Sequence, residues 1–239
     1  MAVLSLGSTT FGWDSADSNV RVENTATSAW TVSAKSNKSI SGLQIVNGAA
    51  NVDTLGGKSF VSRFNNLNFR YGSGGGLNAS RVDIRDSFIT AQAGNNADSL
   101  SFNNVSGSSI VAQLRGGSDT LSFTNSNISS SNFDLGAGAD SVVFNPKTTL
   151  SSRTIINLGD ADGAADTVNF TSTSNNKPYV LGARITNFET GDTLRIGSTS
   201  YTGTQLQQSN PSIGYVYNAT TQSGRFTSGL LTGLTIEFN

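Results

Sequence analysis

The chain has 239 residues, a formal net charge of -1 at pH 7, and neither histidine nor cysteine. Without imidazole or thiol groups it cannot build a Ser-His-Asp or Cys-His nucleophilic site, a His/Cys zinc site, an iron–sulfur centre or a disulfide. The balanced charge and the lack of an apolar run near the roughly 20 residues of a membrane span predict no nucleic-acid partner and no membrane insertion.

The composition favours strands and turns over helices. Serine, threonine and asparagine make up 87 of the 239 residues, whereas charged residues make up 13%. Ser and Asn favour turns, and Thr favours strands. The hydrophobic fraction of 36% with so little net charge is atypical of a disordered chain, so an all-β fold is expected.

Residues 1–40 match no repeat and are predicted to form an N-terminal cap or assembly segment. The apolar start Met1–Leu6 has no basic segment and soon meets polar residues, so no signal peptide is predicted. Trp13 and Trp30 are interpreted as cap or core residues, with a sugar-binding platform as the alternative. A cap is expected because a stack of strands must cover its exposed end.

Residues 41–197 carry a repeat that predicts a single-chain parallel β-solenoid with coils of about 21–26 residues. Its motif is Asp-[Ser/Thr]-[Leu/Val]-x-[Phe/Ile], and successive copies lie 21, 21, 26 and 26 residues apart. The two apolar positions are two residues apart, so both point to one face of a strand and form the core. Less regular segments, Phe60–Tyr71 and Val82–Ile89, predict earlier coils separated by Gly72–Gly76. The five copies are Asp98–Phe102, Asp119–Phe123, Asp140–Phe144, Asp166–Phe170 and Asp192–Ile196.

Residues 198–239 lose the repeat and are predicted to close the other end. Gly214–Tyr217 and Arg225–Thr227 flank the turn-forming residues Asn218–Gly224, which is typical of a hairpin. Leu230–Ile236 is expected to supply a final strand. The sequence therefore predicts a C-terminal β-hairpin cap.

The first residue of each repeat predicts a column of five aspartates along one edge of the stack. Like charges on neighbouring strands repel, so the column must be neutralised or solvated. In one interpretation each carboxylate accepts backbone N–H bonds in an Asx turn. In the other it binds a cation. The column comprises Asp98, Asp119, Asp140, Asp166 and Asp192.

The segment Leu135–Val143, with Gly136 and Gly138 before Asp140, resembles the glycine-rich nonapeptide of repeats-in-toxin (RTX) proteins. Ile185–Ile196 is similar to the segment that follows such repeats, and the resemblance covers about residues 90–239. It implies Ca²⁺ held by turn carboxylates and backbone carbonyls. The resemblance points to Asp140 as a ligand, with Asp98, Asp119 and Asp192 at turns that have fewer of the glycines. Independently, Asp160, Asp162 and Asp166 place three carboxylates within seven residues of one expanded turn, which either binds Ca²⁺ or is a solvated acidic loop.

Charge is distributed unevenly along the chain. Residues 58–85 have a net charge of +4, and residues 91–170 a net charge of -4. This asymmetry either orients the protein on a partner or a second copy, or reflects ordinary solvated faces.

No catalytic residue and no required cofactor are predicted, because coils of 21 residues leave little chain to build a cleft. The expected function is that of a non-enzymatic structural protein on the surface of a phage virion, as a capsid decoration or cement protein or a tail-associated protein. Its expected partners are capsid or tail proteins and copies of itself, as in a trimer. The alternative is a secreted, RTX-like calcium-binding protein of the cell surface, such as an S-layer component or adhesin.

Overall fold

The computed structural model describes residues 2–239 except 7–8, 14–19, 27–28, 35–38, 48–51, 58–62, 73, 92–93, 152, 160 and 172–178. Side chains are described from Ser41 on, apart from those gaps and residues 44, 46–47, 52–57 and 180. The regular secondary structure of the described part is all strand apart from one short helix, α1 (Gly203–Leu206), and one 3₁₀ helix, η1 (Pro211–Ile213). No helix in the described ranges is long and apolar enough to cross a membrane.

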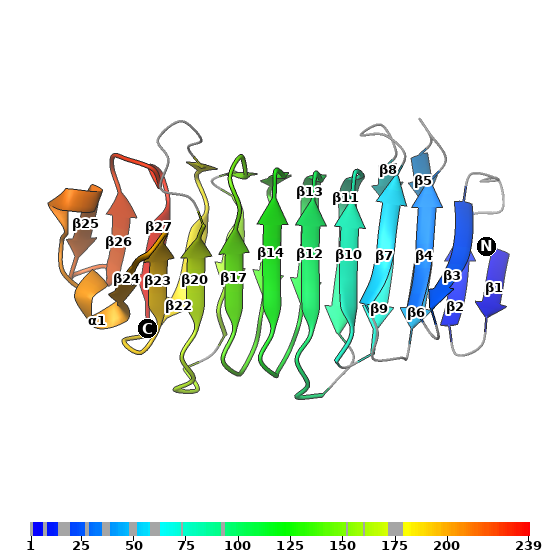
Figure 1. Cartoon of the computed structure of the whole chain (residues 1–239), viewed down its shortest axis with the longest axis horizontal. Helices are drawn as coiled ribbons and strands as arrows, with labels where there is room; N and C mark the ends of the chain where they lie inside the picture. Colours follow the sequence, from blue (N-terminus) through cyan, green and yellow to red (C-terminus); the bar gives the residue numbers. More distant parts are fainter. Residues whose placement is uncertain are drawn as a thin grey trace.

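Strands stack side by side along the long axis of a rod, which confirms the predicted parallel β-solenoid (Figure 1). The first of its three ranks of strands is a ten-stranded sheet in which neighbours from β4 to β23 pair in parallel. In order, this first rank contains β3 (Val20–Ala26), β4 (Ala29–Ala34), β7 (Val52–Gly57), β10 (Gly76–Ser80), β12 (Ser99–Asn103), β14 (Thr120–Thr124), β17 (Ser141–Phe144), β20 (Thr167–Phe170), β23 (Thr193–Ile196) and β24 (Thr199–Thr202).

The remaining strands form a second sheet in which each coil supplies two further segments, the second and third ranks. The second rank contains β5 (Ser39–Ser41), β8 (Arg63–Asn65), the first halves of β11 (Asp83–Ala91) and β13 (Ser106–Gln113), β15 (Asn127–Ser129), β18 (Thr149–Leu150) and β21 (Val180–Leu181). The third rank contains β6 (Gln44–Asn47), β9 (Asn68–Tyr71), the second halves of β11 and β13, β16 (Asn132–Asp134), β19 (Ile155–Asn157), β22 (Arg184–Phe188) and β27 (Thr235–Phe238).

The bend between the second and third ranks uses left-handed backbone at residues other than glycine. Asn66, Asp86, Ser109 and Ser130 occupy this bend in successive coils, with φ between 47° and 53°. Asn and Asp tolerate this region because their short polar side chains bond locally. The bend recurs at the same place in these four coils, and Gly42, with φ of 69°, occupies it in the coil before them, so the ranks stay in register there.

The core is built by the two apolar positions of the repeat, as predicted. Leu100, Leu121, Val142, Val168 and Leu194 pair in one row of the first rank and are fully buried. In the adjacent row the rings of Phe102, Phe123, Phe144 and Phe170 stack with centroids 5.4, 5.6 and 4.5 Å apart. Ile196 ends this row and is partly buried.

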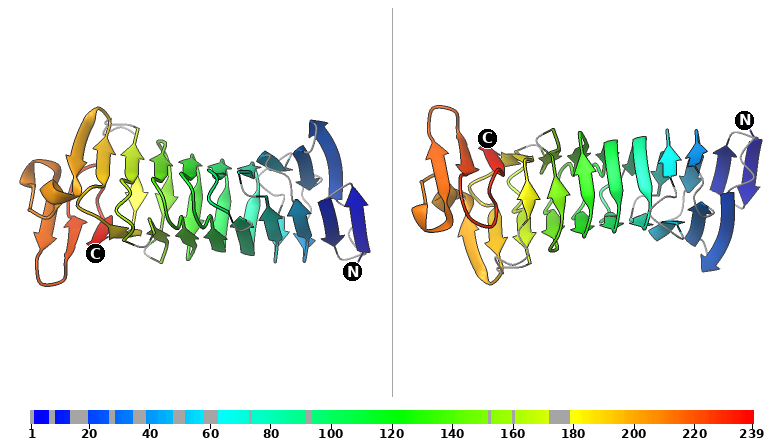
Figure 2. Two further views of the ribbon diagram at one scale, coloured as in Figure 1. Left: turned by 90° about the horizontal axis from the view of Figure 1, so that it is seen from below. Right: turned by 90° about the horizontal axis from the view of Figure 1, so that it is seen from above.

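Both ends of the rod turn to antiparallel pairing (Figure 2). At the N-terminal end β1 (Ala2–Leu6) pairs with β2 (Thr9–Trp13), β2 with β6, and β3 with β4. At the C-terminal end β24 reverses on β23, and β25 (Tyr215–Asn218) forms a hairpin with β26 (Ser223–Phe226). The predicted hairpin is confirmed, whereas the final strand, β27, lies at Thr235–Phe238 instead of Leu230–Ile236, because residues 228–233 form turns. β27 pairs with β26 and with β22. The side chains of Trp13 and Trp30 lie outside those the structure describes.

Candidate functional site

The five aspartates of the repeat form one continuous ladder beside the first rank. Each carboxylate reaches back one coil and accepts a backbone N–H through Oδ1. The donors and distances are Asp98 N to Asp119 at 2.7 Å, Asp119 N to Asp140 at 2.7 Å, Asp140 N to Asp166 at 2.8 Å, and Asp166 N to Asp192 at 2.9 Å. At the N-terminal end, Asp98 Oδ1 accepts N–H bonds from Gly74 and Gly75 at 2.6 and 3.0 Å. The carboxylates thus accept backbone N–H bonds, as one sequence interpretation proposed, but across coils.

Serine side chains do the same at the other two bends of the coil. Ser126 Oγ accepts the N–H of Val105, and Ser131 Oγ accepts that of Ile110, both at 3.1 Å and across 21 residues. Where the chain turns between ranks the main-chain ladder is interrupted, and a buried N–H left without a partner is costly. Sequence reasoning missed these serines, although Ser126 and Ser131 follow the Asp119 motif within the same repeat.

The second oxygen of the aspartates distinguishes the aspartate ladder from the serines. Oδ2 of Asp98, Asp119 and Asp140 is buried without a hydrogen-bond partner. Burial is the largest cause that raises the pKa of Asp119 to about 6, Asp166 to about 7 and Asp140 to about 8. Neighbouring carboxylates raise these pKa values further, while the backbone N–H bonds oppose the rise. Near neutral pH the ladder therefore favours bound protons or a bound cation.

The turns before the ladder stack so closely that they need glycine. At Gly136, with φ of 94°, an added Cβ would lie 1.6 Å from the carbonyl oxygen of Arg115 in the preceding coil. At Gly138, with φ of 125°, it would lie 1.8 Å from the carbonyl oxygen of Gly117. Any side chain at either position would push the coils apart.

The predicted ligands of the expanded turn separate in the structure. Asp166 belongs to the ladder, whereas Asp162 is exposed and accepts N–H bonds from Gly138 at 2.6 Å and Ala164 at 2.8 Å. Asp160 lies outside the described residues. Within the described ranges no three acidic side chains are grouped as metal ligands.

The orphaned oxygens are of the ligand type that a hard cation prefers. Calcium takes oxygen ligands from carboxylates, backbone carbonyls and water. Oδ2 of Asp98, Asp119 and Asp140 is the oxygen that could coordinate a cation, because Oδ1 already accepts N–H bonds. A bound Ca²⁺ would supply the positive charge that the buried carboxylates lack.

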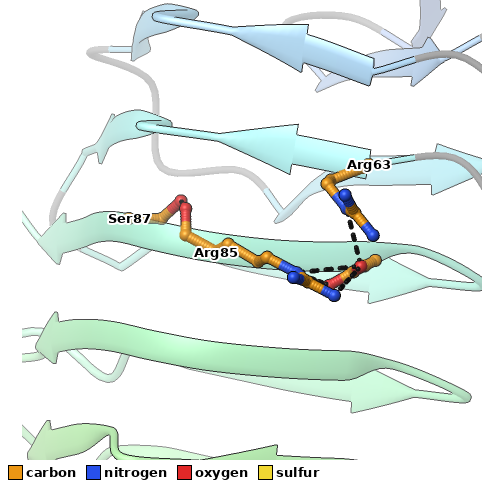
Figure 3. Close-up of polar contacts among 4 residues, drawn as sticks. Arg63, Arg85 and Ser87 are labelled. Atoms are coloured by element: carbon orange, nitrogen blue, oxygen red, sulfur yellow. Dashed lines mark hydrogen bonds and ion pairs between the residues drawn. The ribbon is translucent and has the colours of Figure 1, made fainter.

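Two arginines of the basic segment share one carboxylate on the second rank (Figure 3). Asp83 accepts from Arg63 Nε at 2.8 Å and from Arg85 Nε at 3.1 Å, and Arg85 also forms an ion pair with it at 2.9 Å. Ser87 Oγ donates to the Arg85 carbonyl and accepts the N–H of Leu67. This cluster joins adjacent coils. Because Asp83 pairs with both arginines, it also neutralises part of the local positive charge.

Comparison of the chain with protein-family models, with curated proteins and with solved structures found no match. Function is therefore inferred from the chain's own residues.

Proposed function

We propose that the protein is a non-enzymatic structural component of a phage virion surface, decorating or cementing the capsid or associated with the tail. The observation that carries the proposal is the first rank: from β10 to β23 the strands pair without a register shift. Antiparallel strands cover both ends of this stack. A capped, regular stack resists edge-to-edge aggregation and suits a rigid surface element.

The outer face of the first rank supports close contact with other structural proteins. Every outward residue of the described strands β10, β12, β14, β17 and β20 is uncharged, and most are Ser, Thr or Asn. Such a face can pack against a capsid or tail protein, or a copy of itself in a trimer, without charge repulsion. These are the partners we propose.

Quantitative mass spectrometry of purified virions tests this function. A virion protein is expected at a fixed copy number relative to the major capsid protein, and to remain after high-salt washing. Recovery of the chain from the medium or envelope of phage-free cultures would contradict the proposal.

A second candidate is favoured by the orphaned carboxylate oxygens: a secreted, RTX-like calcium-binding protein of the cell surface. Calorimetric titration of the chelated protein with CaCl₂, with MgCl₂ as control, tests it. Asp140→Asn keeps an oxygen that can accept the N–H of Asp119 but removes the charge, so it is expected to abolish calcium binding without unfolding the chain. Absence of calcium heat in the wild type excludes this candidate and leaves the virion proposal standing.

A further inference from the structure

Large apolar side chains lie on the outside of the third rank. Phe88 is 55% exposed, and among the described residues the other large hydrophobic side chain so exposed is Val216. Phe88 pairs with Val111, which pairs with Asn132 and then Ile155 in successive coils. Val111 and Ile155 are partly exposed. The four side chains make an apolar row along the rod, interrupted by one amide.

A polar row runs beside this apolar row, two residues further along each strand. It contains Thr90, Gln113, Asp134, Asn157 and Thr186, paired coil by coil, and the exposed Arg70 pairs with Thr90 in the coil before them. At about 4.8 Å per coil, the row extends for about 19 Å. Its hydroxyl, amide and carboxylate groups form a linear track of hydrogen-bonding groups.

A hollow of about 340 Å³ lies at the centre of the polar row. Its lining comprises Gln113, Arg115, Asp134, Gly136, Ala137 and Asn157. Asn157 Nδ2 donates to Asp134 Oδ1 at 3.0 Å and its Oδ1 accepts from Asn187 at 2.8 Å, while Arg115 Nε donates to the Ala91 carbonyl at 3.0 Å. These bonds hold the planar groups in place before any ligand arrives, which lowers the entropic cost of binding.

Arg115 occupies a backbone position that suits glycine. Its φ is 82°, and Gly136 and Gly159 follow Leu135 and Leu158 as Arg115 follows Leu114, with φ of 94° and 130°. A side chain is disfavoured in this region, although the bends between the second and third ranks also place residues other than glycine there. Glycine fills the position in the next two coils, whereas here the Arg115 guanidinium bonds the Ala91 carbonyl and lines the hollow.

We propose that the outer face of the third rank binds a neutral, hexose-containing glycan chain that lies along the rod. A sugar ring has an apolar C–H face, which would pack on Phe88 and Val111, and hydroxyl groups, which would bond Gln113, Asp134 and Asn157. The charges of Arg115 and Asp134 offset one another at the hollow, which favours an uncharged ligand. This proposal does not depend on the virion assignment.

Affinity electrophoresis in native gels cast with dextran, galactomannan or glucomannan tests the proposal, with alginate as an acidic control. Retardation by at least one neutral polymer is expected. Phe88→Ser and Gln113→Ala should each weaken the apparent affinity about tenfold, the loss of one aromatic or hydrogen-bonding contact. Val216→Ser is the matched control, since it removes the other exposed hydrophobic side chain, on β25, and should leave retardation unchanged.

Three results would overturn the proposal. One is the absence of the expected affinity pattern: none of the three neutral polymers retards the protein, or they retard Phe88→Ser as much as the wild type. Another is that only alginate retards it and added salt abolishes the effect, which indicates charge attraction by surface arginines. The third is a lower oligomeric mass of Phe88→Ser in sedimentation, which assigns the face to contact between copies. Circular dichroism confirms that each variant folds.

Discussion

Removing the charge of Asp140 tests the physical account of the aspartate ladder. In the native state the pKa of Asp140 is raised to about 8, whereas an unfolded aspartate titrates near its ordinary value of about 3.9. The native state therefore binds more protons than the unfolded state between these pH values. The resulting stability is complete below about pH 4 and is lost as pH rises through about 8.

The magnitude follows from the size of the shift. Each pKa unit corresponds to about 1.4 kcal/mol, which sets an upper limit of about 6 kcal/mol for Asp140. Solvent near the turn screens part of this, and roughly half, about 3 kcal/mol, is expected to be measured. Asp166, with a pKa raised to about 7, and Asp119, raised to about 6, add to the loss with the same sign.

The assay is urea unfolding followed by circular dichroism from pH 4.5 to pH 9 in the presence of a chelator. Wild-type stability should fall as pH rises, and Asp140→Asn should be about 3 kcal/mol more stable than wild type at pH 9 but not at pH 4.5. If the protein binds calcium, adding it at pH 8 should restore the lost stability. Wild-type stability that stays level or rises towards pH 9, with no gain from Asp140→Asn, would refute the reasoning.

Further predictions concern packing and hydrogen bonding. Phe123→Ala, which empties the space between Phe102 and Phe144, should destabilise the chain by about 3–5 kcal/mol, and an unchanged urea midpoint would contradict the inward assignment. Ser126→Ala leaves the N–H of Val105 unpaired and should cost about 1–3 kcal/mol in the same assay, an effect that Ser126→Thr, with its hydroxyl retained, should reduce. Gly136→Ala should prevent folding or lower the melting temperature strongly, and a melting temperature equal to wild type would disprove the close stacking of turns.

The repeat predicted the first rank because its signal is direct. Leu and Phe two residues apart point to the same face of a strand, so both are buried when that face is the inner one. Their rows do form the core. The coil before Asp98 was harder to recognise, because Gly75 stands one residue before β10 where Asp98 stands before β12. Leu77 and Ala79 of this coil still occupy the core rows. The predicted separating segment Gly72–Gly76 therefore leads directly into a strand of the stack, since β10 begins at Gly76.

The other two ranks and the candidate glycan face were less accessible from sequence. Strands of three residues, such as β15 and β16, carry too few alternations to show a period, and their separation depends on a left-handed Ser130 that has no strong sequence signal. The aspartate column could be predicted, but not that each carboxylate would bond the coil before it. That detail depends on the offset between stacked coils, which only the assembled fold defines.

Every bond of the aspartate ladder runs from a coil to the one that follows it in the chain. During synthesis, therefore, the N–H of Asp98 has no carboxylate acceptor until Asp119 is made, and the N–H of Asp119 has none until Asp140 is made. The last acceptor of the series is Asp192. At Asp192 the ladder ends within its own turn, because Asp192 Oδ2 accepts the N–H of Glu189 and the N–H of Asp192 donates to the Glu189 carbonyl. The ladder thus gives the rod a chemical direction: a chain cut short at its C-terminal side exposes unpaired donors, whereas one shortened at its N-terminal side exposes acceptors that water readily satisfies.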